Sequence, residues 1–144
     1  MQIRQENPGD YKAVFALLEH AFRNEVHSDH KEQFLVEDLR KSAQFIPELS
    51  LVAELENKIV GYILLTKIKI KNTENEYTSL ALAPVAVHPD YQNQGIGAEL
   101  IRHAHQKAKE LNFDSIILLG HQDYYPKFGY KPAKSIPLDR APIN

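Results

Sequence analysis

The stretch Ala83–Gly97, APVAVHPDYQNQGIG, contains the end of an apolar strand, a polar turn and a loop with two glycines. The run Thr78–Val87 that leads into it is mostly apolar and of strand length, which is typical of a central strand. Because proline cannot donate to a sheet ladder, Pro84 predicts a bulge or an end of pairing there. A helix is predicted directly after the loop, because apolar residues recur at helical spacing. These residues are Ile96, Leu100, Ala104, Ala108 and Leu111.

The loop Gln92–Ala98 has the composition of a phosphate-binding turn. Gly95 and Gly97 allow backbone N–H groups to come close to a ligand, and the start of a helix adds unpaired donors and a partial positive charge. A glycine turn without a ligand is the simpler alternative for any isolated G-x-G. The position between a strand and a helix favours an anion site, and a pyrophosphate suits it.

Two other phosphate-binding motifs differ from this loop. A P-loop requires Gly-Lys-Ser/Thr after its glycines, and the chain has no such tripeptide. A dinucleotide fingerprint requires a third small residue three positions after Gly97, where Leu100 stands. Asp114 lies about where that fingerprint places an acidic ribose partner, but the preceding hairpins do not build the βαβ unit that it needs. The dinucleotide alternative stays open at this point.

The residues before this stretch predict an N-terminal strand and two helices. Gln2–Gln5 is a short strand candidate, and Asn7 followed by Pro8 is typical of a helix cap and first helical position. Apolar residues recur at helical spacing over Tyr11–Phe22. A second helix is expected over residues 31–42. Its inward face is expected to carry Phe34, Leu35 and Leu39.

Further strands are expected on both sides of the glycine loop. Leu49–Leu55 and Ile59–Lys71 form a hairpin and lead into the strand that contains Pro84. After the loop, Ser115–Leu119 is a buried strand candidate, a short helical piece is expected over residues 124–128, and a last strand starts from Tyr130 onward. The order is β-α-α-β-β-β-α-β-α-β, a mixed α/β pattern with a central antiparallel meander.

Length and composition indicate one ordinary globular domain over residues 1–144, with 43% hydrophobic and 25% charged residues. The net charge of −2 gives no basic field for nucleic acid or an anionic membrane. The absence of cysteine excludes disulfides, thiolate metal sites and a cysteine nucleophile. The N-terminus lacks a signal architecture, and the longest apolar stretch is broken by lysines, so a cytoplasmic protein is expected.

The residues from Ala83 to Gly97 resemble the acetyl-CoA motif of the GNAT superfamily of N-acetyltransferases, a strand followed by Q/R-x-x-G-x-G/A. The later run Leu118–Tyr130, with its YYPKFGY, is similar to the second CoA element of that superfamily. The phrases APVAV and YYPKFGY look closest to a bacterial branch of predicted acetyltransferases. The resemblance implies a mixed, mostly antiparallel sheet flanked by helices, and an acetyltransferase that uses acetyl-CoA as cosubstrate and needs no metal.

The resemblance also implies roles for single residues. Backbone groups of the Val85–Val87 strand would hold the acetyl carbonyl and the pantetheine arm, and amides of the glycine loop would hold the pyrophosphate. Pro84 would help to separate the strand from its neighbour. Tyr125 would lie near the thioester sulfur and protonate the thiolate, whereas Tyr124 would pack. The implied cofactor-binding set is Val85, Ala86, Val87, Gln92, Asn93, Gln94, Gly95, Ile96, Gly97, Ala98 and Tyr125, with Tyr125 also catalytic.

The general base and the acceptor are less defined. Supplying a lysine-like amine as free base at pH 7 costs about 4.6 kcal/mol, so such a substrate needs a base. Leu80–Ala83 stands where many relatives carry glutamate. Glu25, His27 and Glu54 are the alternatives, each also explained as a solvated surface group. A metal cluster of His27, Asp29 and His30 is considered and not favoured, because seven histidines make chance groupings common.

The C-terminal residues 131–144 depart from the pattern of the superfamily, which ends in two strands that close one side of the acceptor site. Pro132, Pro137 and Pro142 argue against a central strand. Three explanations stay open: a shortened chain, an open acceptor side, or completion by another subunit, as in a homodimer. Two functions are therefore carried forward. The first is acetyl transfer to a small-molecule or protein amine, and the second is an acyl-CoA-binding module with little or no catalysis.

Overall fold

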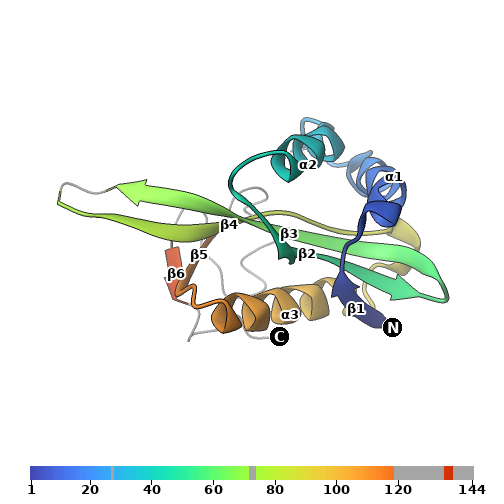
Figure 1. Ribbon diagram of the computed structural model, residues 1–144. Coiled ribbons are helices and arrows are strands. Elements are labelled where there is room, and N and C mark those ends of the chain that lie inside the picture. The colour runs from blue at the N-terminus through green and yellow to red at the C-terminus, as the bar shows by residue number, and fades with distance from the viewer. Residues whose placement is uncertain (27, 72–73, 119–134, 138–144) are drawn as a thin grey trace.

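The protein, described from a computed structural model, is a six-stranded sheet with helices on both faces (Figure 1). The structure describes residues 1–26, 28–71, 74–118 and 135–137. The strands are β1 (Gln2–Gln5), β2 (Phe45–Leu55), β3 (Lys58–Lys71), β4 (Glu76–Val87), β5 (Ser115–Leu118) and β6 (Ser135–Pro137), in spatial order β1-β2-β3-β4-β5-β6. All neighbours pair antiparallel except β4 and β5, which are parallel. The mixed α/β class and the mostly antiparallel sheet are confirmed.

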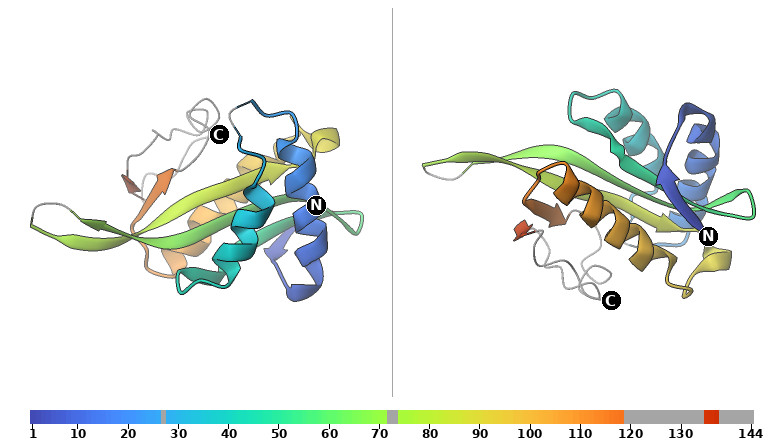
Figure 2. Two further views of the ribbon diagram at one scale, coloured as in Figure 1. Left: turned by 90° about the horizontal axis from the view of Figure 1, so that it is seen from above. Right: turned by 60° about the horizontal axis from the view of Figure 1, so that its bottom comes forward.

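Two helices lie on one face of the sheet and one on the other (Figures 1 and 2). Asn7 caps a 3₁₀ turn over Pro8–Asp10 as predicted, accepting from the Gly9 N–H at 3.0 Å, and α1 (Tyr11–Phe22) continues from that turn. The second helix, α2 (Glu32–Arg40), is shorter than expected. No described helix is long and apolar enough to cross a bilayer.

The inward face of α2 differs from the expectation. Leu39 packs against the apolar cluster below the helix, as predicted, but Phe34 and Leu35 are 50% and 42% exposed, whereas Gln33 and Val36 are buried. The cause is Arg40, which binds the buried Glu6 carboxylate with Nη2–Oε2 at 2.5 Å and lies 4.0 Å from the centre of the Tyr11 ring. This pair turns Gln33, Val36 and Arg40, spaced three and four residues apart, toward the body of the domain.

Two apolar clusters fill the two faces. The cluster under α1 and α2 includes Ala86 of β4. The other cluster lies against α3 (Ile96–Glu110) and includes Val85, with Val87 packed at its margin. Gly61 of β3 makes the second contact close, because an added Cβ there would lie 2.9 Å from Leu100 Cδ1 and 3.0 Å from Ile96 Cγ2. The first turns of α3 are therefore held tightly against the sheet, next to the end of β4.

The strand β4 has a bulge at Pro84. Leu82 pairs with Leu65 of β3, and Val85 pairs with Ile63. Between these two pairs β4 therefore contains one residue more than β3. One extra residue in β4 is the geometry of a β-bulge. Pairing of β4 with β5 covers Leu80–Leu82 only, so within the described residues it ends before Pro84. The predicted bulge is confirmed, whereas an end of pairing with β5 is not tested, because the residues that follow Leu118 lie outside the described part of the chain.

The C-terminal part is described only in β6, which pairs with the outer side of β5 and ends the sheet. Pro137 therefore stands in an edge strand, where proline is tolerated. The helix expected over residues 124–128 lies outside the described residues.

Candidate functional site: a loop, a strand edge and a neighbouring pocket

The loop between β4 and α3 is shaped by two residues with positive φ, Asn93 at 64° and Gly95 at 82°. After a 3₁₀ turn over Pro89–Tyr91, the chain reverses through these positions into the helix. Gly95 is required for this conformation, because side chains rarely adopt a φ of 82°. No heavy atom lies within 4 Å of the place where a Cβ of Gly95 would stand, so the loop faces open space.

The first amides of α3 have no partner in their own helix. The first four N–H groups of any α-helix lack intrahelical acceptors, and here Gly95 at the cap position supplies no side-chain bond. Ile96 and Gly97 are buried while Gln92–Gly95 are exposed, so the helix start is anchored and the loop above it is accessible. Anchored, uncapped amides at a helix N-terminus are suited to bind an anion such as a phosphate.

The backbone groups of Val85 and Val87 point away from β3. The His88 N–H donates to the Val60 carbonyl at 2.8 Å, so residues 60 and 88 form a hydrogen-bonded pair. In an antiparallel ladder such pairs alternate with non-bonded ones, and Gly61–Val87 and Ile63–Val85 fall on the non-bonded positions. Their N–H and C=O groups therefore face the side of β4 on which β5 lies. The Gln92 side chain reaches this edge, with its Nε2 donating to the Val87 carbonyl at 3.4 Å.

The strand edge and the loop thus form one continuous row of backbone groups. Val85 and Val87 present theirs beyond the last β5 pair at Leu82, and the uncapped amides of α3 follow after the turn. Among the described residues no strand pairs with Val85–Val87 on this side, and the amides at the other end of the row are suited to bind an anion. This arrangement fits a long ligand with an amide-rich arm and a phosphorylated end.

A sequence model of the acetyltransferase (GNAT) family matches residues 12–130. The chain belongs to this family. The uncharacterized N-acetyltransferase YjhQ of Escherichia coli K12 is 38% identical over 102 residues, which are 71% of this chain and 56% of that protein, so the match spans just over half of its length.

Two solved structures show the same fold. A GNAT family acetyltransferase from Brucella melitensis in complex with acetyl-CoA is 32% identical, with a TM-score of 0.82 over 94% of this chain and 86% of that one. The E. coli N-acetyltransferase YhbS in complex with CoA is 26% identical, with a TM-score of 0.74 over 90% and 68% of the two chains. Both relatives bind a CoA compound.

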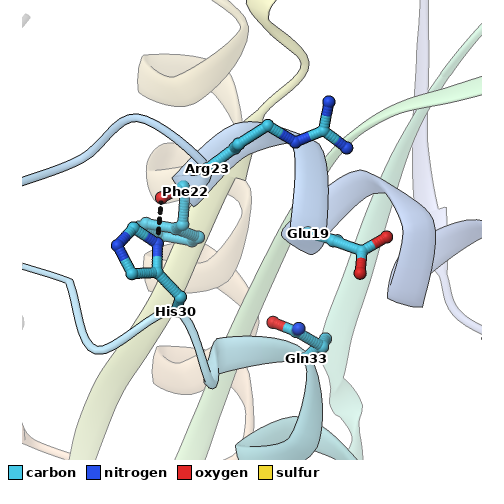
Figure 3. Close-up of a pocket in the computed structure, with 5 residues that line it drawn as sticks. All are labelled: Glu19, Phe22, Arg23, His30 and Gln33. Atoms are coloured by element: carbon cyan, nitrogen blue, oxygen red, sulfur yellow. Dashed lines mark hydrogen bonds between the residues drawn. The ribbon is translucent and has the colours of Figure 1, made fainter.

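A separate pocket of about 240 Å³ lies between α1 and α2 of this GNAT domain (Figure 3). His30 contributes an imidazole whose Nδ1 lies 2.9 Å from the Phe22 carbonyl oxygen. Glu19 and Gln33 point into the space between the two helices from opposite sides (Figure 3). Phe22 also packs against the apolar cluster that contains Ala86 of β4. Its lining residues are Glu19, Phe22, Arg23, His30 and Gln33.

A larger depression of about 500 Å³ runs along α1 from Gly9 to His20, and several of the charged residues that line it are paired with one another. Arg4 binds Asp10 at 2.8 Å and Glu54 at 3.0 Å. The Arg4 guanidinium lowers the pKa of Asp10 below its usual range, and the two carboxylates raise the pKa of Arg4. His20 and His88 line its other side, with ring centres 5.7 Å apart.

Of the residues predicted to bind the cofactor, all but Tyr125 lie in the part of the chain that the structure describes. The structure brings Val85–Val87 and Gln92–Ala98 together at the end of β4. Tyr124 and Tyr125 lie outside the described residues, so the catalytic role of Tyr125 stays a prediction.

The predicted bases do not gather at this site. Glu54 is paired with Arg4, Glu25 is exposed in the turn after α1, and His27 lies outside the described residues. Of the considered metal cluster, Asp29 accepts from the Lys31 N–H at 3.0 Å and His30 faces the Phe22 carbonyl.

Sequence reasoning missed the pocket residues Glu19 and Gln33, and assigned His30 only to the metal alternative. A signal for Gln33 was present, because Gln33, Val36 and Arg40 share one face of α2. The prediction from the sequence instead placed Phe34 and Leu35, which are more apolar, on the buried face of the helix.

Proposed function

We propose that the chain is an acetyl-CoA-dependent N-acetyltransferase that moves an acetyl group to an amine by direct attack on the thioester. One observation carries the proposal: the outward-facing backbone groups of Val85 and Val87 continue into the uncapped amides at the start of α3. The complexes of the Brucella melitensis and YhbS proteins with acetyl-CoA and CoA support it.

In this proposal the amides at the start of α3 bind the pyrophosphate, and the β4 edge binds the pantetheine arm. A β-strand edge pairs naturally with the two amides of that arm, since strand addition to an open edge is a common mode of recognition. An N–H of the Val85–Val87 segment stabilises the negative charge that develops on the thioester oxygen during attack. Losing one such donor typically costs roughly 10²–10³ in rate.

Tyr125 is proposed as the acid that protonates the departing thiolate. This role rests on the resemblance of YYPKFGY to the second CoA element of the family, since residue 125 lies outside the described residues. Tyrosine is suited to the role because its hydroxyl can donate to sulfur and its unperturbed pKa is about 10.

Ligand-induced stabilisation tests the proposal. A ligand that binds the folded state only adds about 2.7 kcal/mol to the free energy of unfolding at 100 times its Kd. The melting temperature is measured with acetyl-CoA, CoA, NAD and ATP in turn. Acetyl-CoA and CoA should raise it, and NAD and ATP should not. Release of free thiol on adding a panel of amines then tests transfer. Stabilisation by NAD or ATP without an effect of acetyl-CoA would overturn the proposal.

An acyl-CoA-binding module without efficient catalysis is the second candidate. The observation that favours it is the apolar composition of β4, where Leu80, Leu82 and Ala83 offer no acid beside the edge. Stabilisation by acetyl-CoA without thiol release from any amine would support this alternative.

A further inference from the structure

The outward face of α2 carries two apolar side chains that the domain does not bury. Phe34 and Leu35 are 50% and 42% exposed, and the Phe34 ring lies edge-to-face against Phe15 of α1, with ring centres 5.5 Å apart. The helix itself is fixed to the body of the domain by the pair of Arg40 with Glu6. A half-exposed aromatic ring on a fixed helix is typical of the residues that anchor protein–protein contacts.

Two charges of opposite sign flank these side chains on the same face. Lys31 precedes Phe34 by three residues and Asp38 follows it by four, so the spacing places Lys31, Phe34, Leu35 and Asp38 on one stripe of the helix. Lys31 and Asp38 are exposed, and the described part of the chain contains no ion pair of either residue. Both charges are therefore available to a partner.

Each charge has the unfavourable sign for its place in the helix. Lys31 stands at the N-cap, where the helix dipole favours an anion, and Asp38 lies in the last turn, where the dipole favours a cation. Lys31 also provides no side-chain cap bond, in contrast to the residues that usually occupy this position. Neither residue stabilises α2 through the dipole, and an opposite charge beside each would relieve the conflict.

The stripe is complementary to itself in the antiparallel direction. Lys31 and Asp38 are seven residues apart, and the midpoint between them falls between Phe34 and Leu35. A two-fold axis through that midpoint, perpendicular to the helix, sets Lys31 of one copy opposite Asp38 of a second copy at both ends of the contact. The four apolar side chains meet in the middle. A patch that faces itself across a two-fold axis is the usual form of a homodimer interface.

We propose that α2 is the contact surface of a homodimer, in which the stripe Lys31, Phe34, Leu35 and Asp38 packs antiparallel on the same stripe of a second copy. Antiparallel packing also brings opposite ends of the two helix dipoles together. The helix has 9 residues, so the contact is small and the dimer is weak, with a Kd of roughly 10–100 µM. The inference does not depend on acetyl transfer, because α3 and its first amides lie on the other face of the sheet (Figure 1).

Charge reversal tests the pairing, with the Kd of the full chain measured by sedimentation equilibrium. The wild-type dimer should weaken as salt is added, because salt screens the charge pairs at its ends. Asp38→Lys brings two cations together at each end and should raise the Kd about tenfold or more. The double variant Lys31→Asp with Asp38→Lys restores opposite charges and should restore the dimer. Glu37→Lys is the matched control, since it makes the same change of charge at an exposed position outside the stripe and should leave the Kd unchanged.

Cysteine trapping tests the position of the axis, because the chain has no cysteine of its own. A residue beside a two-fold axis meets its own counterpart, so Leu35→Cys should form a disulfide-linked dimer under mild oxidation. Residue 37 lies further along the helix and off the stripe, so Glu37→Cys should cross-link about tenfold more slowly. Circular dichroism checks that each variant is folded.

The contradicting outcomes are specific. A wild-type chain that stays monomeric at about ten times the upper expected Kd would overturn the proposal. A dimer that Asp38→Lys leaves intact, or a folded double variant that stays monomeric, would place the contact on another surface and overturn it as well. Equal rates of cross-linking at positions 35 and 37 would do the same. A monomer that co-sediments with phosphatidylcholine vesicles would assign the stripe to a lipid surface instead and overturn the dimer.

Discussion

At the scale of single residues, Gly97 is the position where a side chain most directly tests the anion site. It is buried in the first turn of α3, beside the uncapped amides. Gly97→Asp places a carboxylate where the pyrophosphate is proposed to bind, and an acid in the first turn is favourable for the helix itself. We expect loss of CoA binding by calorimetry with the fold retained by circular dichroism. Gly97→Ala, which adds bulk without charge, should weaken binding less. Unchanged affinity in a folded Gly97→Asp variant would remove the loop from the site.

The hydroxyl of Tyr125 is the second residue-scale test. Tyr125→Phe keeps the ring and removes only the proposed proton donor, so acetyl-CoA binding should persist. CoA thiolate is a fairly good leaving group, and kcat should fall roughly 10–100-fold with little change in KM. Tyr124→Phe is the matched control and should be nearly silent. Damage from Tyr124→Phe instead would shift the assigned position by one residue, and no effect of either would leave protonation to solvent.

At the scale of elements, α2 is held in place by one buried ion pair. The Glu6 side chain is 1% exposed and that of Arg40 is 9% exposed, and Glu6 also accepts from Ser50 Oγ at 2.7 Å. The Ser50 hydroxyl lies 2.7 Å from the Tyr62 hydroxyl, whose pKa is raised by burial and by the nearby Glu6 charge. A single network therefore joins the start of α1, the end of α2 and two central strands.

Arg40→Met should destabilise the protein by about 3–5 kcal/mol, because it leaves the Glu6 carboxylate buried without its cation. Urea unfolding at pH 7 measures this loss. The double variant Glu6→Gln with Arg40→Met removes both charges and should lose less than the single variant. Equal losses in the two would show that packing of the arginine stem over Tyr11, rather than the charge, holds the helix.

At the scale of the whole molecule, global stability should depend on pH through His105. It is 2% exposed on the inner face of α3, and burial, with a smaller effect of the Lys109 charge, lowers its pKa to about 4 from 6.5. Between these values the unfolded chain binds a proton that the folded chain does not, so stability falls as the pH falls from 6.5 toward 4. Asp10, whose pKa is lowered by Arg4, adds a further loss below its usual value of 3.8.

The expected loss between pH 7 and pH 5 from His105 is about 2 kcal/mol, measured by urea unfolding at both values. His105→Leu removes the titrating ring from the buried face and should flatten the profile in this range. His103→Gln, on the exposed face of the same helix, should leave the profile as it is. A wild-type profile that is flat between pH 7 and pH 5 would contradict the prediction.

The order of the described elements and the shape of the glycine loop Gln92–Ala98 followed from local signals in the sequence. The Asn7 cap, the break at Pro84 and the reversal at Gly95 depend on the backbone preferences of single residues, which act over a few neighbours in any context. The helix predicted after the glycine loop is present as α3, which begins at Ile96. The match to the family model then confirmed the resemblance that the loop and the strand before it carry.

Contacts between distant segments decided the rest. The orientation of α2 depends on Glu6 and Arg40, which are 34 residues apart, and a compensated buried charge pair outweighed the apolar character of Phe34 and Leu35. The pocket likewise depends on how α1 and α2 pack, because residues of both helices line it. Periodicity along the chain shows which residues share a helix face, but only tertiary packing selects the face that is buried.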